Sequence, residues 1–322
     1  MLNSLETDLK SKSVIEDMLS EVEARLLEYT QSESEKSQYL AQYLIKRGGK
    51  RLRPLLVILS AGPDNRKEAV DVGVAAELIH TASLIHDDIV DSSKMRRGAS
   101  TINSKWSDGI AVLVGDFLFA KAFEILSIYQ HKEVLATFTK AITAMSVGEI
   151  EQLSNRNNLN KSYEQYYREI FGKTATLLAA CCKSGGQLAG VSDIELTALE
   201  TYGLELGYSF QVIDDLLDVV GCSNELGKPK FQDLKEGNIT LPIINLLEKD
   251  QELEVIKTLQ IESRIDFSVV SQLVVKANVI EYCQNVARGH IDNCLKSIEI
   301  IKSDTQKEIL KNIAEMTLKR EK

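Results

Sequence analysis

Apolar residues recur at the spacing of an α-helix along most of the chain. In the first forty residues, Met18, Val22 and Leu26 stand four apart, which places them on one face of a helix. Long segments with the same periodicity then follow one another, separated by short polar joints. No segment alternates apolar and polar residues between two turns, as a half-buried strand would. The pattern therefore predicts an all-α chain.

Local signals mark where some of these helices begin. Ser162 with Gln165, and Ser192 with Glu195, have the spacing of capping boxes at helix starts. Proline and glycine are scarce, with 4 and 18 among 322 residues, which leaves little room for the turns of a β-sandwich or barrel. Two glycines beyond the acidic motifs described below are expected to end their helices: Gly98 and Gly221.

The chain shows no low-complexity linker long enough to divide it. A single domain over residues 1–322 is therefore expected. It comprises an N-terminal helical extension (1–40), a motif-bearing core (41–245) and C-terminal helices (246–322).

Charge and cysteine usage narrow the class of protein. The formal net charge is −9 and the isoelectric point is near 5.2, which argues against nucleic acid as a partner. The five cysteines form no CxxC pair, so we expect reduced thiols in a cytoplasmic protein. The N-terminus has charges where a signal peptide has its apolar region, and no run approaches the roughly 20 apolar residues of a spanning helix. No transmembrane segment is expected.

One acidic motif occurs twice, as DDIVD over residues 87–91 and as DDLLD over residues 214–218. In each, the first and last aspartates stand four apart and share one helix face. Carboxylates that repel each other on a buried face need a positive partner. Oxygen ligands suit magnesium above other ions, and magnesium often also holds a phosphate. A single motif is more often a solvated helix face, but the repeat predicts two facing metal clamps for a diphosphate.

Basic residues gather in two places. The segment GGKRLRP holds Lys50, Arg51 and Arg53 after two glycines, which let the backbone approach an anion that the cations neutralise. Arg96 and Arg97 follow the first acidic motif. Each cluster also has an ordinary explanation. The first could be a basic helix start on a solvated face, and the second could compensate the dipole at a helix C-terminus.

His80 lies seven residues before Asp87, on nearly the same helix face. It is either a donor to phosphate or an ordinary, partly buried histidine, whereas His86 points elsewhere. The His86–Asp87 pair also occurs in helical HD-type phosphohydrolases. Those enzymes need further ligands, and the sequence around His131 and His290 offers none, so that function is disfavoured.

Four polar residues complete the candidate catalytic set. Lys173 and Thr174 stand in FGKTATLL, Gln211 in FQVIDD and Lys228 in GKP, each close to an apolar run. Singly, each is typical of a helix surface, so their interpretation depends on the acidic and basic motifs.

Together these elements resemble the trans-isoprenyl diphosphate synthases. GGKRLRP, IHTASLIHDDIVD with RRG, GKT, GYSFQVIDDLLD and LGKP with EGNITLP occur in that family's order, over about residues 40 to 245. The resemblance implies an all-α bundle around a deep central cavity, working as a dimer. It also implies a prenyltransferase with three magnesium ions per active site, which adds isopentenyl diphosphate to an allylic diphosphate such as farnesyl diphosphate.

The same resemblance implies a role for each motif residue. The metal ligands would be Asp87, Asp91, Asp214 and Asp218. The allylic diphosphate would bind Arg96, Lys173, Thr174, Gln211 and Lys228, and isopentenyl diphosphate would bind Lys50, Arg53, His80 and Arg97. Metal and cations stabilise the leaving diphosphate, oxygen dipoles face the allylic cation, and a proton finally leaves to the departing diphosphate.

Asn238 is a departure from the family pattern. Many members have a lysine there, so the asparagine removes one cation near the second clamp. A similar asparagine occurs in the larger subunits of two-component heptaprenyl synthases. The implied partner is therefore a second copy or a small regulatory subunit, with transient membrane contact for product release.

Product length in the family depends on bulk below the first acidic motif. Short-chain members have an aromatic floor four or five residues before it, where this chain has small residues. This implies an open tunnel and a medium or long all-trans product. Heptaprenyl diphosphate is expected first, hexaprenyl and octaprenyl diphosphates next, and geranylgeranyl diphosphate is the shorter alternative. Phe119 and Phe123 are either a deeper floor or core packing. The chain-length positions are Ala76, Ile79, Ala82 and Ser83.

Two other classes of function compete. A regulatory, non-catalytic subunit typically loses one acidic motif, and a terpene cyclase of the same fold normally lacks the second motif and GGKRLRP. This chain has both motifs and GGKRLRP, which favours a catalytic elongase.

Overall fold

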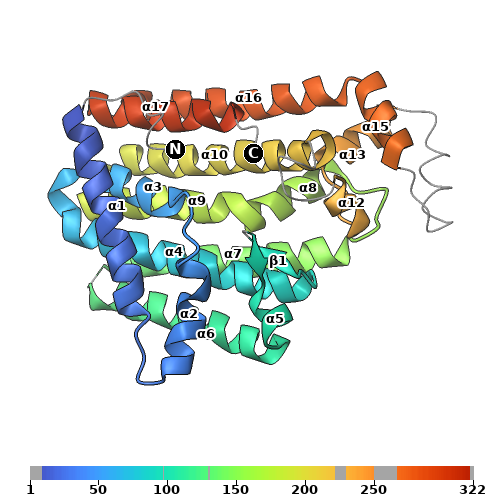
Figure 1. Ribbon diagram of the computed structural model, residues 1–322. Helices are drawn as coiled ribbons and strands as arrows, with labels where there is room; N and C mark the ends of the chain where they lie inside the picture. The colour runs from blue at the N-terminus through green and yellow to red at the C-terminus, as the bar shows by residue number, and fades with distance from the viewer. Residues whose placement is uncertain (1–8, 97, 130, 222–229, 250–266, 320–322) are drawn as a thin grey trace. The chain divides into compact units, whose positions relative to one another are not determined.

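The computed structural model describes residues 9–96, 98–129, 131–221, 230–249 and 267–319. Within these ranges the chain is helical apart from its joints and one short hairpin, in which β1 (Met95–Arg96) pairs antiparallel with β2 (Ala99–Ser100) (Figure 1). The prediction of an all-α fold is confirmed.

The helices follow one another with short connections. Those before residue 160 are α1 (Leu9–Tyr29), α2 (Glu35–Ile45), α3 (Leu52–Ala61), the 3₁₀ turn η2 (Pro63–Asn65), α4 (Arg66–Val90), α5 (Ile102–Lys105), α6 (Asp108–Ile128) and α7 (Lys132–Ser154). Those after it are α8 (Tyr163–Ile170), the π-helical turn η3 (Phe171–Ala175), α9 (Thr176–Ala189), α10 (Asp193–Val220), α12 (Gln232–Lys235), α13 (Leu241–Lys249), α15 (Phe267–Lys276), α16 (Val279–Ser297), the 3₁₀ turn η4 (Ile298–Ile300) and α17 (Asp304–Leu318).

The chain divides into two compact units, and helices such as α7 and α10 contribute residues to both. The expectations of a single domain over residues 1–322 and of a central cavity stay predictions. Unit 1 comprises the residues up to Ile142, Leu177–Gly203 and Ile298–Asn312, and unit 2 comprises Thr143–Thr176, Leu204–Ser297 and the residues from Ile313 on.

Unit 1 is built around α4, which packs against α6, α3 and α1 (Figure 1). Every residue from Ala69 to Ile79 is buried, as expected of a helix that is covered on all faces. Two glycines allow close packing: a Cβ on Gly73 would lie 3.2 Å from Pro54 of α3, and a Cβ on Gly115 of α6 would overlap the ring of His86.

Arg51 anchors the start of α3. It has a left-handed backbone conformation (φ 46°) and is 5% exposed. Its guanidinium donates to Glu77 of α4 at 2.7 Å, to Glu23 of α1 at 2.6 and 3.0 Å, and to the carbonyl of Ile45 at 3.0 Å. Arg51 therefore holds three helices of unit 1 together, and its charge is directed to carboxylates of the protein itself.

The two glycines expected to end helices behave differently. Gly221 directly follows α10, and its N–H donates to the carbonyl of Leu217 at 2.8 Å, as expected. The expectation for Gly98 is wrong, because α4 ends at Val90 and a β-hairpin intervenes. Gly98 has a φ of 71° and lies between the two strands of that hairpin.

Both predicted capping boxes are present. Ser162 accepts from the N–H of Gln165 at 3.2 Å, and the Gln165 side chain accepts from the N–H of Ser162 at 2.9 Å, at the start of α8. Ser192 and Glu195 make the same pair of bonds, each at 3.3 Å, at the start of α10. These caps satisfy N–H groups that the first helical turn leaves without partners.

Unit 2 has an apolar core to which α8, α10, α13, α15 and α16 contribute. Val212 and Leu216 of α10 stand four apart and are buried in it, on the same helix as the second acidic motif. Tyr166 of α8 is also in this core and is 1% exposed. The hydroxyl of that tyrosine requires a buried partner, and Asp215 of α10 supplies it.

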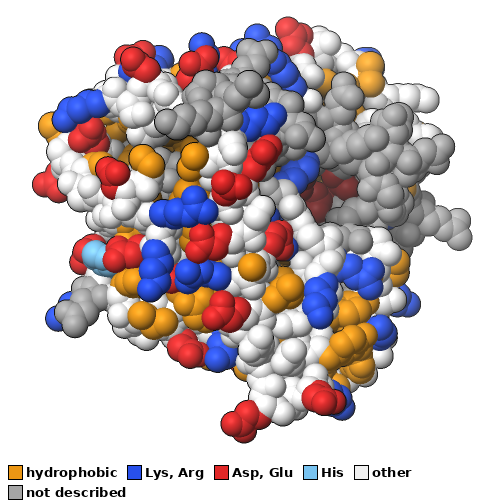
Figure 2. All heavy atoms as spheres, turned by 60° about the vertical axis from the view of Figure 1, so that its left-hand side comes forward, with side chains coloured by type: hydrophobic (Ala, Val, Ile, Leu, Met, Phe, Trp, Pro, Cys, Tyr) orange, Lys and Arg blue, Asp and Glu red, His pale blue; other side chains and the backbone are white. Residues whose placement is uncertain are grey.

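No helix in the described part of the chain is long and apolar enough to cross a membrane. Figure 2 shows Lys and Arg side chains intermixed with Asp and Glu over the face drawn. That mixture differs from the continuous basic surface that is typical of nucleic-acid-binding proteins.

We predict that Arg51→Met lowers the free energy of unfolding by about 3–5 kcal/mol, because Glu77 is left buried without its partner. The matched control is Arg66→Met, which removes an exposed ion pair with Glu21 (3.3 Å, 45% exposed arginine). That loss should cost at most about 1 kcal/mol. Urea unfolding followed by circular dichroism checks both, and equal losses would contradict the anchoring role of Arg51.

Candidate active site

The first acidic motif lies at the C-terminal end of α4, in unit 1. Asp87 and Asp91 stand one turn apart and are half-buried, whereas Asp88 is 1% exposed. The helix therefore separates the middle carboxylate, which faces the interior of the unit, from the outer two. Asp91 also caps α4, since its N–H donates to the carbonyl of Asp87 at 2.8 Å.

Arg96 neutralises the buried Asp88. The hairpin folds back on the end of α4, so that Arg96 Nε donates to Asp88 Oδ1 at 2.6 Å. Asn103 Nδ2 fixes the same turn by donating to the carbonyls of Asp88 at 3.1 Å and Ser93 at 3.3 Å. A guanidinium has five N–H donors, so this bond orients Arg96 without exhausting its capacity to bind a diphosphate.

The other predicted cations of unit 1 lie around the start of α3. Lys50 is exposed and Arg53 is half-buried, on either side of the anchored Arg51. His80 is half-buried on α4. Arg97, expected beside them, lies outside the described residues.

His86 faces α6, away from the first acidic motif. Its Nε2 lies 3.2 Å from the carbonyl oxygen of Val112, and its ring packs beside Phe119 with centroids 5.8 Å apart. Phe119 and Phe123 are both half-buried.

The chain-length positions are more closely packed than an open tunnel requires. Ala76, Ile79 and Ala82 have no exposed surface, while Ser83 is half-buried. A growing apolar chain along this face of α4 would have to displace packed side chains. The tunnel therefore stays a prediction, and Ser83 is its most accessible position.

The second acidic motif, on α10 in unit 2, shows the same division as the first. Asp214 is exposed and Asp218 is half-buried, whereas Asp215 is 3% exposed. Burial raises the pKa of Asp215 to about 7, with the nearby Asp233 adding to the effect, while bonds from Gln211 and Tyr166 favour the ionised form. The ionised form of the middle aspartate is thus stabilised by hydrogen-bond donors of the protein itself.

Asp215 is part of a continuous chain of buried hydrogen bonds. Its Oδ2 accepts from the hydroxyl of Tyr166 at 2.7 Å, and its Oδ1 accepts from Gln211 Nε2 at 2.8 Å. The amide oxygen of Gln211 in turn accepts from the hydroxyl of Thr174 at 2.6 Å. The structure therefore brings together Thr174 and Gln211, two predicted site residues that lie far apart in sequence.

Asp218 binds the backbone of the segment that follows α10. Its two carboxylate oxygens accept from the N–H groups of Gln232 at 2.9 Å and Asp233 at 3.2 Å, at the start of α12. This N-terminal cap explains how Asp218 is held, because N–H groups at a helix start stabilise a carboxylate. Its predicted role as a metal ligand would have to coexist with that cap.

A π-helical turn presents Lys173 and Thr174. The turn η3 interrupts the helix between α8 and α9, and the N–H of Thr176 donates to the carbonyl of Phe171. Lys173 is exposed, with Nζ 3.3 Å from Gln152 Oε1, whereas Thr174 is buried. Turns of this kind are frequent at functional sites because the wider loop shifts the direction of successive side chains.

Sequence reasoning missed three buried residues of unit 2 that lie in or next to α8, the helix before the π-helical turn. Lys161 and Glu169 form a buried ion pair, and Lys161 also donates to the carbonyl of Ile239 at 2.8 Å, beside the buried Asn238. Tyr166 is the third. No signal in the sequence marks them as buried, because the segment that holds them, NKSYEQYYREI, is polar over most of its length. Lys228, predicted to bind the allylic diphosphate, lies outside the described residues.

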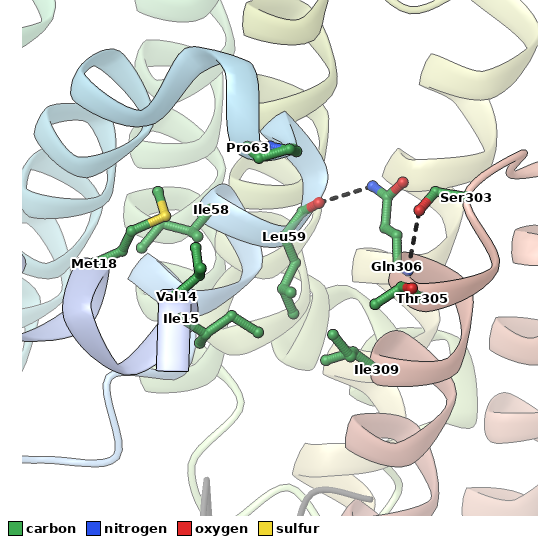
Figure 3. A pocket seen from close by; sticks show the side chains of 11 residues that line it. Val14, Ile15, Met18, Ile58, Leu59, Pro63, Ser303, Thr305, Gln306 and Ile309 are labelled. Carbon is green, nitrogen blue, oxygen red and sulfur yellow. Dashed lines mark hydrogen bonds between the residues drawn. The ribbon is translucent and has the colours of Figure 1, made fainter. Parts of the chain in front are cut away.

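A separate cavity of about 380 Å³ lies in unit 1, between α1, the end of α3 and the start of α17 (Figure 3). Apolar side chains such as Ile15, Leu59 and Ile309 line it, together with Ser303, Thr305 and Gln306. No charged side chain lines it, so it lacks the cations that a diphosphate requires.

The two acidic motifs belong to different units, so their predicted opposition across a cavity stays a prediction. Within the described residues, no three His, Cys, Asp or Glu side chains are grouped closely enough to hold a metal ion by themselves. An ion at either motif would therefore take much of its coordination from water and from phosphate oxygens, which suits magnesium.

Comparison with known proteins agrees with these features. A family model described as polyprenyl synthetase matches residues 34–275. A prenyl transferase of Cyanophora paradoxa is 36% identical over 285 residues, covering 87% of this chain and 88% of the relative. Heptaprenyl diphosphate synthase component 2 of Geobacillus stearothermophilus is 33% identical over 305 residues, covering 94% and 95%.

Solved structures give the same result. A polyprenyl synthase from Caulobacter crescentus, crystallised with calcium and isoprenyl diphosphate, has a TM-score of 0.90 at 33% identity and covers 95% of this chain and 96% of its own. Names among further relatives differ in product length, and include an octaprenyl diphosphate synthase of Escherichia coli (33% identity, 94% and 95% coverage) and a geranylgeranyl diphosphate synthase of Saccharolobus solfataricus (32%, 95% and 97%).

We predict that Gly172→Ala destabilises unit 2 and lowers activity. The added Cβ would lie 2.7 Å from the Gly148 Cα and from the Ala144 carbonyl oxygen, so the π-helical turn would shift. Overpacking of this kind typically costs about 1–3 kcal/mol. Gly289→Ala on α16 is the matched control, since it meets nothing within 4 Å and should add roughly 0.5–1 kcal/mol. Thermal unfolding distinguishes the two variants. An unchanged unfolding temperature in Gly172→Ala would contradict the close-packing argument.

Proposed function

The chain belongs to the polyprenyl synthetase family, and from this premise we propose that it is a magnesium-dependent trans-polyprenyl diphosphate synthase. It would condense isopentenyl diphosphate with an allylic diphosphate such as farnesyl diphosphate. The observation that carries the proposal is the pairing, in unit 2, of Thr174 with Gln211 beside an acidic motif whose middle aspartate is buried. Polar oxygens next to a carboxylate site suit a reaction in which an anion leaves and a cation forms.

Magnesium fits the outer aspartates. Asp87 and Asp91 at the end of α4 are half-buried and Asp214 on α10 is exposed, so all three carboxylates can reach an ion, and hard oxygen donors are what magnesium prefers. Asp218 would be a fourth ligand, and its carboxylate would then bind an ion while it also accepts the N–H groups at the start of α12. Three ions per site, when bound, would supply positive charge that stabilises the leaving diphosphate.

The cations would divide the two substrates between them. Lys50 and Arg53, set by the anchored Arg51, would hold isopentenyl diphosphate with His80 and Arg97. Arg96, oriented by Asp88, would hold the allylic diphosphate with Lys173 and Lys228. Asn238 supplies no charge. Binding of the allylic diphosphate would therefore depend more on the remaining cations than it does in relatives with a lysine at that position.

Chain elongation then follows from electrostatics. The carbon–oxygen bond of the allylic diphosphate breaks, the diphosphate leaves with the electron pair, and the oxygens of Thr174 and Gln211 stabilise the allylic cation. The double bond of isopentenyl diphosphate attacks the cation, and a proton passes to the departing diphosphate. Bonds and charges balance without an oxidant or reductant.

We propose heptaprenyl diphosphate as the main product. Small residues at Ala82 and Ser83 and the similarity to a heptaprenyl synthase component support it. Names among the relatives also include shorter and longer products, and geranylgeranyl diphosphate is the alternative. The name component 2 further supports a small partner subunit in place of, or beside, a second copy of this chain.

One assay tests the proposed function. The purified chain is incubated with farnesyl and isopentenyl diphosphates and magnesium, and the products are sized by chromatography. A seven-unit product is expected. If only a mixture with a small regulatory subunit is active, the two-component form of the proposal holds. Release of inorganic diphosphate without any longer prenyl product would contradict it.

We predict that Asp87→Ala and Asp214→Ala each abolish turnover while the chain stays folded. Each variant removes one carboxylate ligand and relieves repulsion in the metal-free protein, so its unfolding temperature should hold or rise. Asp292→Ala, on the exposed face of α16, is the matched control and should keep full activity. Full activity of either motif variant at saturating magnesium would rule out the metal clamp.

We predict that Ser83→Phe shortens the product toward geranylgeranyl diphosphate, because the ring would lie one turn before Asp87, across a growing chain. The first condensation should change little. Phenylalanine at Ala82 or Ala76 should also cost stability, since both sites are fully buried. Ala120→Phe, exposed on α6, is the control. Products of unchanged length from Ser83→Phe would show that the chain does not grow along this face.

A further inference from the structure

The buried hydrogen bonds from Tyr166 to Thr174 form a chain with a defined direction. Tyr166, Asp215, Gln211 and Thr174 are each at most 6% exposed. The three bonds that join them measure 2.7, 2.8 and 2.6 Å in that order. Burial excludes water as an alternative partner, so each group must satisfy its neighbour.

The acceptor character of Asp215 sets that direction. The two oxygens of the Asp215 carboxyl face the Tyr166 hydroxyl and the Gln211 NH₂ group, and each of these groups donates a hydrogen bond to it. Tyr166 does so through its hydroxyl, and Gln211 must turn its NH₂ group toward Asp215. A glutamine amide has donors on one side and the acceptor on the other. The carbonyl oxygen of Gln211 is therefore directed toward Thr174.

The orientation of the Thr174 hydroxyl follows from the orientation of the Gln211 amide. A threonine hydroxyl has a single proton, and here that proton is donated to the Gln211 oxygen. The remaining surface of the Thr174 oxygen carries only lone pairs. If the Gln211 amide were reversed, its NH₂ would face Thr174 and the hydroxyl proton would turn elsewhere. A proton in that place would repel a cation that an oxygen lone pair attracts.

We propose that Tyr166 and Asp215 are positioning residues that set the polarity of the Thr174–Gln211 pair toward the allylic cation. The proposal rests on the proposed function, which places that cation beside the pair. Neither residue touches the substrate. Asp215 fixes which end of the Gln211 amide is presented, and Tyr166 holds the second oxygen of Asp215 so that the carboxylate cannot rotate.

Tyr167 supplies a matched control. It is adjacent in α8, packs edge-to-face on Tyr166 with ring centroids 5.6 Å apart, and bonds through its hydroxyl to His290 Nε2 at 3.0 Å. His290 of α16 in turn binds Glu205 of α10 at 2.7 Å, so this branch ends at Glu205 and does not reach Gln211. Replacement of either tyrosine by phenylalanine removes one hydroxyl and keeps the ring in place.

The kinetic experiment compares Tyr166→Phe with Tyr167→Phe, using farnesyl and isopentenyl diphosphates with magnesium. Tyr166→Phe should lower kcat about tenfold, a typical effect of one charge-assisted hydrogen bond, with both KM values changed less than about twofold. Tyr167→Phe should keep kcat while losing a similar amount of thermal stability. Equal kcat values for the two variants would overturn the proposal, as would a Tyr166→Phe defect confined to KM.

An NMR experiment tests the positioning role independently of the proposed function. The side-chain amide of Gln211 is observed by NMR in protein labelled with ¹⁵N-glutamine, and assigned through its loss in Gln211→Glu. Its protons should exchange slowly in the parent and in Tyr167→Phe, and clearly faster in Tyr166→Phe. If the parent makes no polyprenyl product, the proposed function fails, and this experiment still decides the positioning role. Unchanged exchange in Tyr166→Phe would refute it.

Discussion

Repulsion between neighbouring carboxylates is the constraint around which both acidic motifs are organised. Each acidic motif holds three aspartates within five residues, and the chain resolves the repulsion in the same way twice. The middle aspartate is buried and partnered by the protein, Asp88 by Arg96 and Asp215 by Tyr166 with Gln211. The outer aspartates lie nearer the solvent, where a divalent ion can neutralise them.

The supporting charges follow the same logic. Arg51 is buried between two glutamates, and Lys161 is buried against Glu169. Each of these cations therefore forms ion pairs with carboxylates of the protein itself. Breaking such buried pairs is costly, so they are effective anchors for the segments that carry Lys50, Arg53 and Lys173. Lys50 and Arg53 flank the first anchor, and the π-helical turn with Lys173 follows the helix that carries the second. The cations predicted to bind substrate thus lie on segments that are fixed by buried ion pairs of the protein itself.

Much of the fold could be predicted from local sequence, because helix periodicity and capping boxes are local properties. The end of α4 was predicted wrongly at Gly98, since a glycine with positive φ serves a hairpin turn as well as a helix end. The π-helical turn leaves no trace in the apolar pattern, because it shifts backbone bonds by one residue without changing the side chains. The anchoring of Arg51 and the role of Tyr166 depend on partners far away in sequence. The packing of Ala76, Ile79 and Ala82 likewise depends on other helices, so small residues alone could not establish an open tunnel.

The central claim is that the outer aspartates bind an allylic diphosphate only through a divalent ion. Isothermal titration calorimetry with an unreactive thio-analogue of farnesyl diphosphate measures this directly, on the unmodified protein, with magnesium and with a chelator. The account predicts clear binding with magnesium and its loss with the chelator, because bare carboxylates repel the diphosphate. Equally tight binding under both conditions would contradict it.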